Sequence, residues 1–116
     1  MPDDCLFCKI VAGEIPSTAV LDRETVYAFR DIAPAAPVHV LVVPKRHIGD
    51  VRDLEQPDGT VLIEMFQAAN EIAASEGIAD SGYRVLFNVG RDAGQTVFHL
   101  HMHLVGGKPL GGVGPG

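Results

Sequence analysis

The sequence predicts an α+β domain built on an antiparallel sheet. About five short segments have the composition of β-strands, whereas only one segment has the apolar spacing of a long helix. These segments follow one another through short turns or a single helical excursion, not in the repeating strand–helix–strand order of a parallel sheet. The 116 residues, 47% of them hydrophobic, are expected to form a single domain spanning 1–116.

The first half of the chain predicts one short helix and three strands. Residues 5–14 (CLFCKIVAGE) form the helix, which ends at Gly13. Residues 17–33 (STAVLDRETVYAFRDIA) form two strands around a polar turn at 22–24. Residues 37–45 (PVHVLVVPK) form a buried strand because they are rich in valine and bounded by proline.

The second half predicts one long helix and two further strands. Residues 60–77 (TVLIEMFQAANEIAASEG) carry apolar side chains at helical spacing, with Thr60 as a plausible N-cap and Gly77 as the stop. Residues 83–90 (YRVLFNVG) and 98–107 (FHLHMHLVGG) are the strands, joined through a short loop that contains two glycines. One long helix leaves part of such a sheet's perimeter uncovered, so we expect a homodimer that buries an edge or the helix.

Composition excludes several classes of function. A net charge of −6 argues against a nucleic-acid partner, because binding a phosphate backbone needs clustered Lys and Arg. No apolar run approaches the roughly 20 residues that span a bilayer, and the N-terminus lacks the pattern of a signal peptide. We therefore expect a cytoplasmic location, no membrane partner and reduced thiols, so that Cys5 and Cys8 are metal ligands, redox groups or spectators.

The stretch HLHMHLV is the strongest chemical signal. Side chains alternate between the two faces of a strand, so His99, His101 and His103 share one face, while the apolar residues between them face the core. Neighbours on one face lie about 6.5–7 Å apart, which suits a tetrahedral phosphate or a metal held between them. Three interpretations remain open at this point: a solvated polar face, a metal site, or covalent catalysis by one imidazole.

The stretch HLHMHLV looks like the signature of the histidine triad (HIT) family. The chain resembles the small nucleotide-binding branch of that family over nearly its whole length, through FCKIVAGEIPS, YAFRDIAPAAPVHVLVVPKRHI and NVGRDAGQTVFHLHMH. The resemblance implies a HIT-like fold: about five antiparallel strands with one long and one short helix. It also implies an enzyme that hydrolyses purine nucleoside phosphoramidates, or related nucleotidyl compounds, through a nucleotidyl-histidine intermediate. The product would be a nucleoside monophosphate such as AMP.

The resemblance assigns a catalytic role to four side chains. His101 would be the nucleophile, oriented by the backbone carbonyl of His99, and His103 would donate to a non-bridging phosphate oxygen. His39 would support the nucleophile's face of the sheet. The hydroxyl of Thr96, at a position usually held by Ser, would protonate or steady the leaving group.

The resemblance also implies a nucleotide site. Asp31 would accept hydrogen bonds from both ribose hydroxyls, and Asn88 would reach the phosphate or the ribose. Backbone N–H groups of Gly94 and Gln95 would approach the phosphate. The base would lie among apolar side chains, although each of these taken singly could equally be core. The full set of expected nucleotide-binding residues is Phe7, Phe29, Asp31, Ile32, Asn88, Gly94, Gln95, Thr96, His101 and His103.

The cysteine pair has the spacing of a zinc knuckle. Cys5 and Cys8 cannot complete a tetrahedral site alone, and His47 and His99 are the available partners. Some histidine-triad relatives hold a structural zinc in this way, whereas others lack the pair, so the cofactor expectation is a possible structural zinc and none for the chemistry.

Three alternatives for the function stay open at this stage. The chain could be a dinucleoside polyphosphate hydrolase, a non-catalytic module that binds purine nucleotides and regulates a partner, or a metal-handling protein that uses the five His and two Cys. Leaving-group specificity is open as well, because residues 106–116 (GGKPLGGVGPG) lack the Trp found in the tail of animal relatives; this segment is expected to be irregular.

Overall fold

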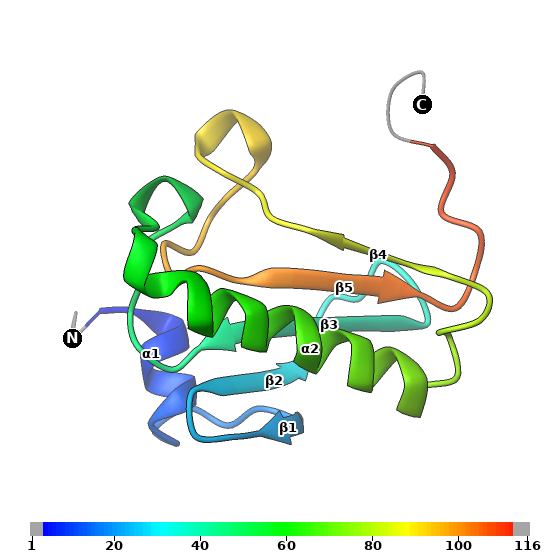
Figure 1. Cartoon of the computed structure of the whole chain (residues 1–116), viewed down its shortest axis with the longest axis horizontal. Coiled ribbons are helices and arrows are strands. Elements are labelled where there is room, and N and C mark those ends of the chain that lie inside the picture. Colours follow the sequence, from blue (N-terminus) through cyan, green and yellow to red (C-terminus); the bar gives the residue numbers. More distant parts are fainter. Residues whose placement is uncertain (1–3, 113–116) are drawn as a thin grey trace.

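The structure is a computed structural model and describes residues 4–112. Five strands form one sheet in the order β1-β2-β3-β5-β4, and every pair of neighbours is antiparallel, which confirms the predicted α+β architecture (Figure 1). The helices and strands are α1 (Leu6–Val11), β1 (Ala19–Asp22), β2 (Val26–Arg30), β3 (Val38–Pro44), α2 (Gly59–Ser75), β4 (Tyr83–Leu86) and β5 (Met102–Gly106). Short 3₁₀ turns cover Val51–Asp53, Gln56–Asp58 and Arg91–Ala93.

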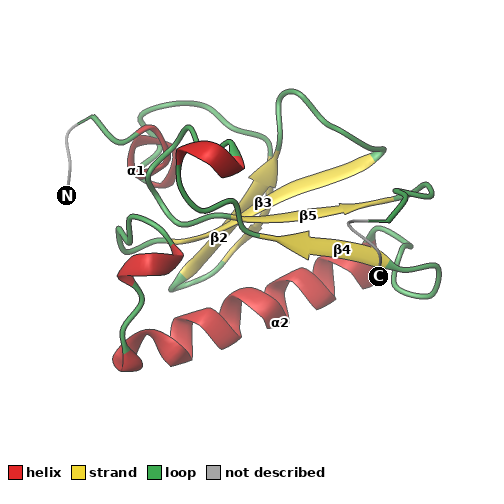
Figure 2. Cartoon of the chain, turned by 90° about the horizontal axis from the view of Figure 1, so that it is seen from above, coloured by secondary structure: helices red, strands yellow, loops and turns green. Residues whose placement is uncertain are grey.

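The two helices lie on opposite faces of the sheet. Figure 2 shows the long helix α2 running along one face and the short helix α1 lying beyond the other. Along β3, Val40 and Val42 are fully buried in the core shared with α2, whereas Leu41 and Val43 pack with α1. Because α1 has only six residues, it covers only part of its face. The uncovered part of this face is where the candidate site lies.

Helix α2 begins two residues earlier than the predicted cap implies. Thr60 was expected to be the N-cap, but the helix starts at Gly59 and Thr60 lies inside its first turn. The reason is the 3₁₀ turn Gln56–Asp58, which leads directly into the helix with Asp58 already in a right-handed conformation. At the other end the prediction is confirmed: Gly77 adopts φ +75° and follows the last helical turn.

Both C-terminal strands are shorter than predicted, and this changes where the histidines lie. Strand β4 ends at Leu86 and β5 begins at Met102, so residues 87–101 leave the sheet. Their hydrogen bonds go elsewhere; the N–H of Leu100, for example, donates to the carbonyl of Ile48 at 2.6 Å. Among the three triad histidines, only His103 therefore belongs to a strand.

The alternation of side chains nevertheless continues through the irregular segment before β5. Leu100, Met102 and Leu104 are buried in the core beneath α2. The histidines between them point to the opposite face.

No helix within residues 4–112 is long and apolar enough to cross a membrane. Of the tail expected to be irregular, residues 113–116 lie outside the described part of the chain.

Candidate active site

A cavity of about 310 Å³ opens on the face of the sheet that α1 partly covers. Two triad histidines, His101 and His103, lie in its wall. Most of the other lining residues are apolar and come from α1, β2, β3 and the loops, and one carboxylate is among them. The lining residues are Leu6, Phe7, Ile10, Phe29, Arg30, Asp31, Ile32, Leu41, Thr96, Val97, His101 and His103. An apolar pocket with a few convergent polar groups is the usual form of a small-molecule site.

One hydrogen bond defines the protonation of His101. Its Nδ1 lies 2.8 Å from the carbonyl oxygen of His99, which can only accept, so Nδ1 carries the proton. The other ring nitrogen, Nε2, therefore keeps its lone pair. Burial lowers the pKa of His101, against the opposing effects of the His99 carbonyl and of Asp31, so the ring stays neutral at physiological pH. A neutral imidazole with a free Nε2 in a cavity wall is a nucleophile.

A second chain of hydrogen bonds defines the protonation of His103. The backbone N–H of Ala35 donates to Nδ1 of His39 at 3.0 Å, so Nδ1 carries no proton and the ring proton of His39 is on Nε2. That Nε2 lies 2.9 Å from Nδ1 of His103, which must accept. The proton of His103 is therefore on Nε2. This atom is buried and has no hydrogen-bond partner among residues 4–112.

An orphaned donor in a cavity wall is a group that a ligand oxygen could satisfy. Leaving a buried N–H without a partner costs free energy, and an acceptor arriving in the cavity removes that cost. Burial, together with His101 and His39, lowers the pKa of His103 to about 4, so the ring is neutral and donates from Nε2 alone. The pairing of β3 with β5 brings the two rings together, because His39 lies diagonally across the strands from His103.

The nitrogens of His39 and His103 form a relay rather than a metal site. Together with Asp31 they place three donor atoms within 4.8 Å of one another. However, the two histidine nitrogens face each other at hydrogen-bond distance, and the Ala35 N–H occupies the other nitrogen of His39. Oδ2 of Asp31 lies 3.5 Å from Nε2 of His39, and its Oδ1 accepts from the N–H of Ala33 at 2.8 Å.

The apolar residues expected around a base divide into two groups. Phe7 and Phe29 are buried and contact each other edge to face, with ring centroids 5.4 Å apart. Phe7 also makes a T-shaped contact with His101, with ring centroids 5.0 Å apart. Ile32, by contrast, is fully exposed although it lies at the cavity. The aromatic pair therefore forms a buried wall of the cavity, whereas Ile32 contributes exposed apolar surface.

The loop before the triad reaches the cavity through Thr96, which is exposed and lies in its wall. The backbone N–H groups of Gly94 and Gln95 are already used inside the loop, donating to Arg91 at 3.0 Å and to Gly90 at 3.1 Å. Asn88 is half-buried and is not part of the cavity wall.

The four residues expected at the metal site come together. Cys5 and Cys8 lie at the start of α1, His47 follows β3, and His99 precedes β5, yet their ligand atoms all lie within 4.8 Å of one another. Sulfur–nitrogen distances are 3.4 Å for three pairs, and the two Nδ1 atoms are 3.3 Å apart. Four ligands on a tetrahedral zinc, with bonds of about 2.3 Å to sulfur and 2.0–2.1 Å to nitrogen, would show spacings of about 3.3 Å between nitrogens, 3.6 Å between sulfur and nitrogen and 3.8 Å between sulfurs.

The surroundings of the cluster also suit a metal. Nε2 of His99 donates to the carbonyl of Pro44 at 2.8 Å, so its Nδ1 lone pair points toward the thiols. The N–H of Cys8 donates to Sγ of Cys5 at 3.3 Å, as expected at a site that favours thiolates. Burial and the neighbouring Cys5 raise the pKa of Cys8 to about 11, so deprotonation of this thiol needs a cation beside it. These residues could hold a metal ion.

The cluster and the nucleophile share one residue. The side chain of His99 belongs to the cluster, while its backbone carbonyl holds Nδ1 of His101. The sequence pattern identified the histidines and cysteines. It did not identify the backbone groups that set the histidine tautomers, namely the N–H of Ala35 and the carbonyl of Pro44. These groups carry no side-chain signal that a sequence pattern could reveal.

A comparison with protein-family models decides the family. The model described as the HIT domain matches residues 12–110. This chain belongs to the HIT family. Among curated relatives, the purine nucleoside phosphoramidase of Escherichia coli is 46% identical to this HIT protein over 111 residues, covering 96% of the chain and 93% of the relative. The Neisseria gonorrhoeae protein HitA is 41% identical over 104 residues, or 90% and 96% of the two chains.

Solved structures of HIT proteins agree with this assignment. A HIT family hydrolase from Clostridium thermocellum superposes with a TM-score of 0.94 and 49% identity, covering 97% of this chain and 98% of the other. The histidine triad nucleotide-binding protein from Candida albicans reaches a TM-score of 0.80 at 32% identity, covering 95% and 86%. The predicted HIT-like fold and the assignment to an enzyme are confirmed: this HIT protein is a hydrolase.

Proposed function

We propose that this protein hydrolyses purine nucleoside phosphoramidates, or closely related nucleotidyl compounds, through a nucleotide covalently bound to His101. The observation that carries the proposal is the pair of fixed tautomers in one cavity wall. His101 offers a free Nε2, and His103 offers a buried N–H with no partner among the described residues. Together they supply a nucleophile for phosphorus and a donor for one of its oxygens.

In the first step, Nε2 of His101 attacks phosphorus and the bond from phosphorus to the leaving nitrogen breaks. The amine departs with one proton, which the hydroxyl of Thr96 in the cavity wall would relay from solvent; the proton released in the second step restores the balance. The imidazole is now a cation bonded to phosphorus, and its Nδ1–H still donates to the carbonyl of His99. His103 donates from Nε2 to a phosphoryl oxygen, where charge builds in the transition state.

In the second step, water attacks phosphorus from the side that the amine has left. The bond between phosphorus and Nε2 breaks, the imidazole becomes neutral again, and a nucleoside monophosphate and one proton are released. Neither step requires a cofactor. The tautomers of His101 and His103 persist through the cycle because backbone groups, which do not titrate, set both of them.

The remainder of the nucleotide is proposed to follow the cavity wall away from the histidines. The base would contact Phe7 and Phe29 and be covered by Ile32, whose exposure in the free protein would then fall. The carboxylate of Asp31 would accept from the ribose hydroxyls with its outward-facing lone pairs.

We infer that the Cys5–Cys8–His47–His99 cluster holds a structural zinc ion. Bound there, zinc would cross-link the start of α1 to the segment before β5 and take no part in the reaction. Through the carbonyl of His99, the same cross-link would hold the acceptor that orients His101.

A homodimer is proposed on the surface where α2 meets β4. Ile63 and Phe66 of α2 are 57% and 38% exposed, and Phe66 packs on Phe87 just beyond β4, with ring centroids 6.4 Å apart. β4 is an edge strand of the described sheet. Phe66→Glu should therefore convert a dimer into a monomer in sedimentation velocity, and a wild-type monomer at micromolar concentration would contradict the proposal.

The proposed reaction is tested with adenosine 5′-phosphoramidates in water enriched in ¹⁸O. One heavy oxygen should enter the AMP produced. In enzyme that is quenched rapidly without acid, which would cleave the bond between phosphorus and histidine, mass spectrometry should find one AMP attached to the peptide that contains His101. His101→Asn should abolish turnover and keep AMP binding. Binding of AMP by the wild-type protein without turnover would favour the regulatory module instead, and turnover of dinucleoside polyphosphates alone would favour the other hydrolase.

A further inference from the structure

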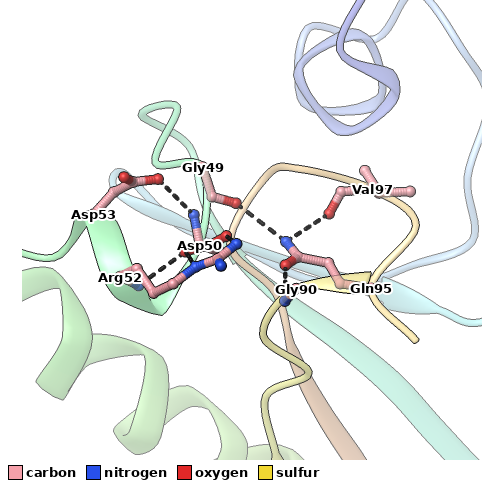
Figure 3. A network of polar contacts seen from close by, with 7 residues as sticks. All are labelled: Gly49, Asp50, Arg52, Asp53, Gly90, Gln95 and Val97. Atoms are coloured by element: carbon pink, nitrogen blue, oxygen red, sulfur yellow. Dashed lines mark hydrogen bonds and ion pairs between the residues drawn. The ribbon is translucent and has the colours of Figure 1, made fainter. Parts of the chain in front are cut away.

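The side chain of Gln95 is buried and fully engaged within the protein. Only 6% of the residue is exposed, although it belongs to the exposed loop before the triad. Its Oε1 accepts from the N–H of Gly90 at 2.7 Å, and its Nε2 donates to the carbonyls of Val97 at 3.1 Å and Gly49 at 3.4 Å. Figure 3 shows the amide between these three partners. Gln95 therefore has no amide hydrogen left for a ligand.

These bonds close the loop on itself and dock it against a second segment. The backbone N–H of Gln95 also donates to the carbonyl of Gly90, so the two residues are bonded in both directions. The bond to Val97 spans Thr96, and the bond to Gly49 reaches the segment that follows the cluster residue His47. The amide thus determines where the stretch carrying the Thr96 hydroxyl lies relative to the rest of the site.

An ion pair supports the same loop from the outside. The carboxylate of Asp50 is buried and accepts from the guanidinium of Arg52 at 2.7 and 3.1 Å, which holds the pKa of Asp50 below its usual range (Figure 3). Arg52 lies beside Gly90, where an added Cβ would come within 3.3 Å of Nη1. Gly90 adopts φ +82°, so its partner Gln95 holds it in a conformation that other residues rarely adopt.

We propose that Gln95 is a positioning residue for the hydrolysis: it holds Thr96 and Val97 against the cavity so that the Thr96 hydroxyl meets the leaving nitrogen. The inference rests on the proposed function and deepens it, because it separates the leaving-group step from nucleotide binding. Thr96 and Val97 line the cavity, whereas Gln95 does not. Gln95 acts through the loop and makes no contact with the substrate.

The test compares Gln95→Glu with Gln56→Glu, the same substitution at an exposed glutamine in a turn away from the cavity. The introduced carboxylate can still accept from Gly90 N–H, but it turns two donor contacts into contacts between oxygens. For an amine leaving group, kcat/KM should fall by about tenfold or more, the effect of losing one well-placed interaction in the transition state. For an aryl ester of AMP, whose leaving group needs no proton, the loss should stay within about threefold, as should the change in Kd for AMP.

Three outcomes overturn the inference. Wild-type rates in Gln95→Glu show that the amide has no positioning role. An equal loss with both substrates together with weaker AMP binding shows that Gln95 acts on the nucleotide. A lower melting temperature with unchanged kcat/KM shows that its role is in stability alone.

Gln95→Met keeps the test decisive if the charged variant does not fold. In this variant, hydrogen exchange of the backbone amides at Gly90 and at position 95 should accelerate at least about tenfold while exchange in β3 and β5 stays unchanged. Unchanged exchange at Gly90 contradicts the inference. Turnover by the wild-type protein separates the two claims: an inactive wild type refutes the proposed function, and the exchange rates then decide by themselves whether Gln95 holds the loop.

Discussion

The relay from Ala35 through His39 to His103 gives the sharpest prediction about the site. His39 has two functions: its Nδ1 accepts from Ala35 N–H, and its Nε2 donates to His103 at 2.9 Å. An amide side chain can replace only one of them. In Gln, the terminal nitrogen reaches the position of Nε2 and can still donate to His103. In Asn, the shorter side chain can accept from Ala35 but cannot reach His103.

The magnitude follows from what His103 loses. Without a donor at Nδ1, its proton is no longer held on Nε2, so the donor to the phosphoryl oxygen is present only part of the time. Complete removal of such a donor costs about 10²–10³-fold in rate. A net hydrogen bond of about 0.5–1.5 kcal/mol maintains the tautomer, so its loss corresponds to roughly 2- to 13-fold. We expect His39→Asn to lower kcat/KM by about tenfold and His39→Gln to stay within about threefold of wild type.

The assay is steady-state hydrolysis of an aryl ester of AMP, with AMP binding measured in parallel. Both variants should bind AMP with nearly wild-type affinity, because the effect arises in the transition state. The reasoning is refuted if His39→Asn is as active as wild type, or if the Gln variant loses as much activity as the Asn variant. In the first case His103 does not depend on the relay; in the second, His39 acts by its ring and not by its Nε2–H.

Four further predictions concern pH, the metal cluster and the core. Burial lowers the pKa of His101 and brings that of His103 to about 4, so both rings stay neutral below pH 6.5. The value of kcat/KM should therefore be constant down to pH 6.5 and fall only at lower pH. A decline of kcat/KM centred at or above pH 6.5 would contradict the assignment. Because unfolded histidines bind protons that these buried rings do not, the free energy of unfolding should also fall as the pH drops from about 6.5 towards 4, measured by urea denaturation. Cys8→Ser should reduce bound zinc to below about a tenth of an equivalent and lower Tm by at least about 4 °C; a wild type without metal would remove the basis for this. Met102→Ala, at a fully buried side chain, should lower the free energy of unfolding by about 2–5 kcal/mol. A loss under about 1 kcal/mol would contradict this, because it would show that the surrounding core closes over the space that the Met102 side chain leaves.

The sequence carried most of the fold because its patterns are local. A valine-rich stretch between prolines is a buried strand, and β3 is buried along its whole length. A run of apolar residues at helical spacing is α2, ended by Gly77. Alternation across the backbone placed three histidines opposite three apolar residues. This held even outside the strand, since Leu100 is buried in the core while His101 faces the cavity.

Predictions of element boundaries were wrong, and the role of the Gln95 side chain was missed, where contacts with other segments of the chain decide the local structure. Thr60 looked like a cap because it precedes the apolar run, but the 3₁₀ turn before it already starts the helix. Strands 83–90 and 98–107 were expected to be long, but the segment between them bonds to the Ile48–Gly49 backbone instead of to the sheet. Gln95 was expected at the phosphate through its backbone, and its side chain proved to be the centre of that segment's hydrogen bonds.

The sequence by itself determined which side chains can do chemistry and on which face they lie, because covalent geometry sets the alternation of side chains along an extended chain. Only the tertiary structure decided which nitrogen of each histidine holds the proton. A carbonyl two residues away fixes His101, an N–H at Ala35 acting through His39 fixes His103, and a carbonyl at Pro44 fixes His99. Imidazole tautomers differ little in free energy until a neighbour bonds one nitrogen, and two of these three neighbours are brought into place by the folding of the chain.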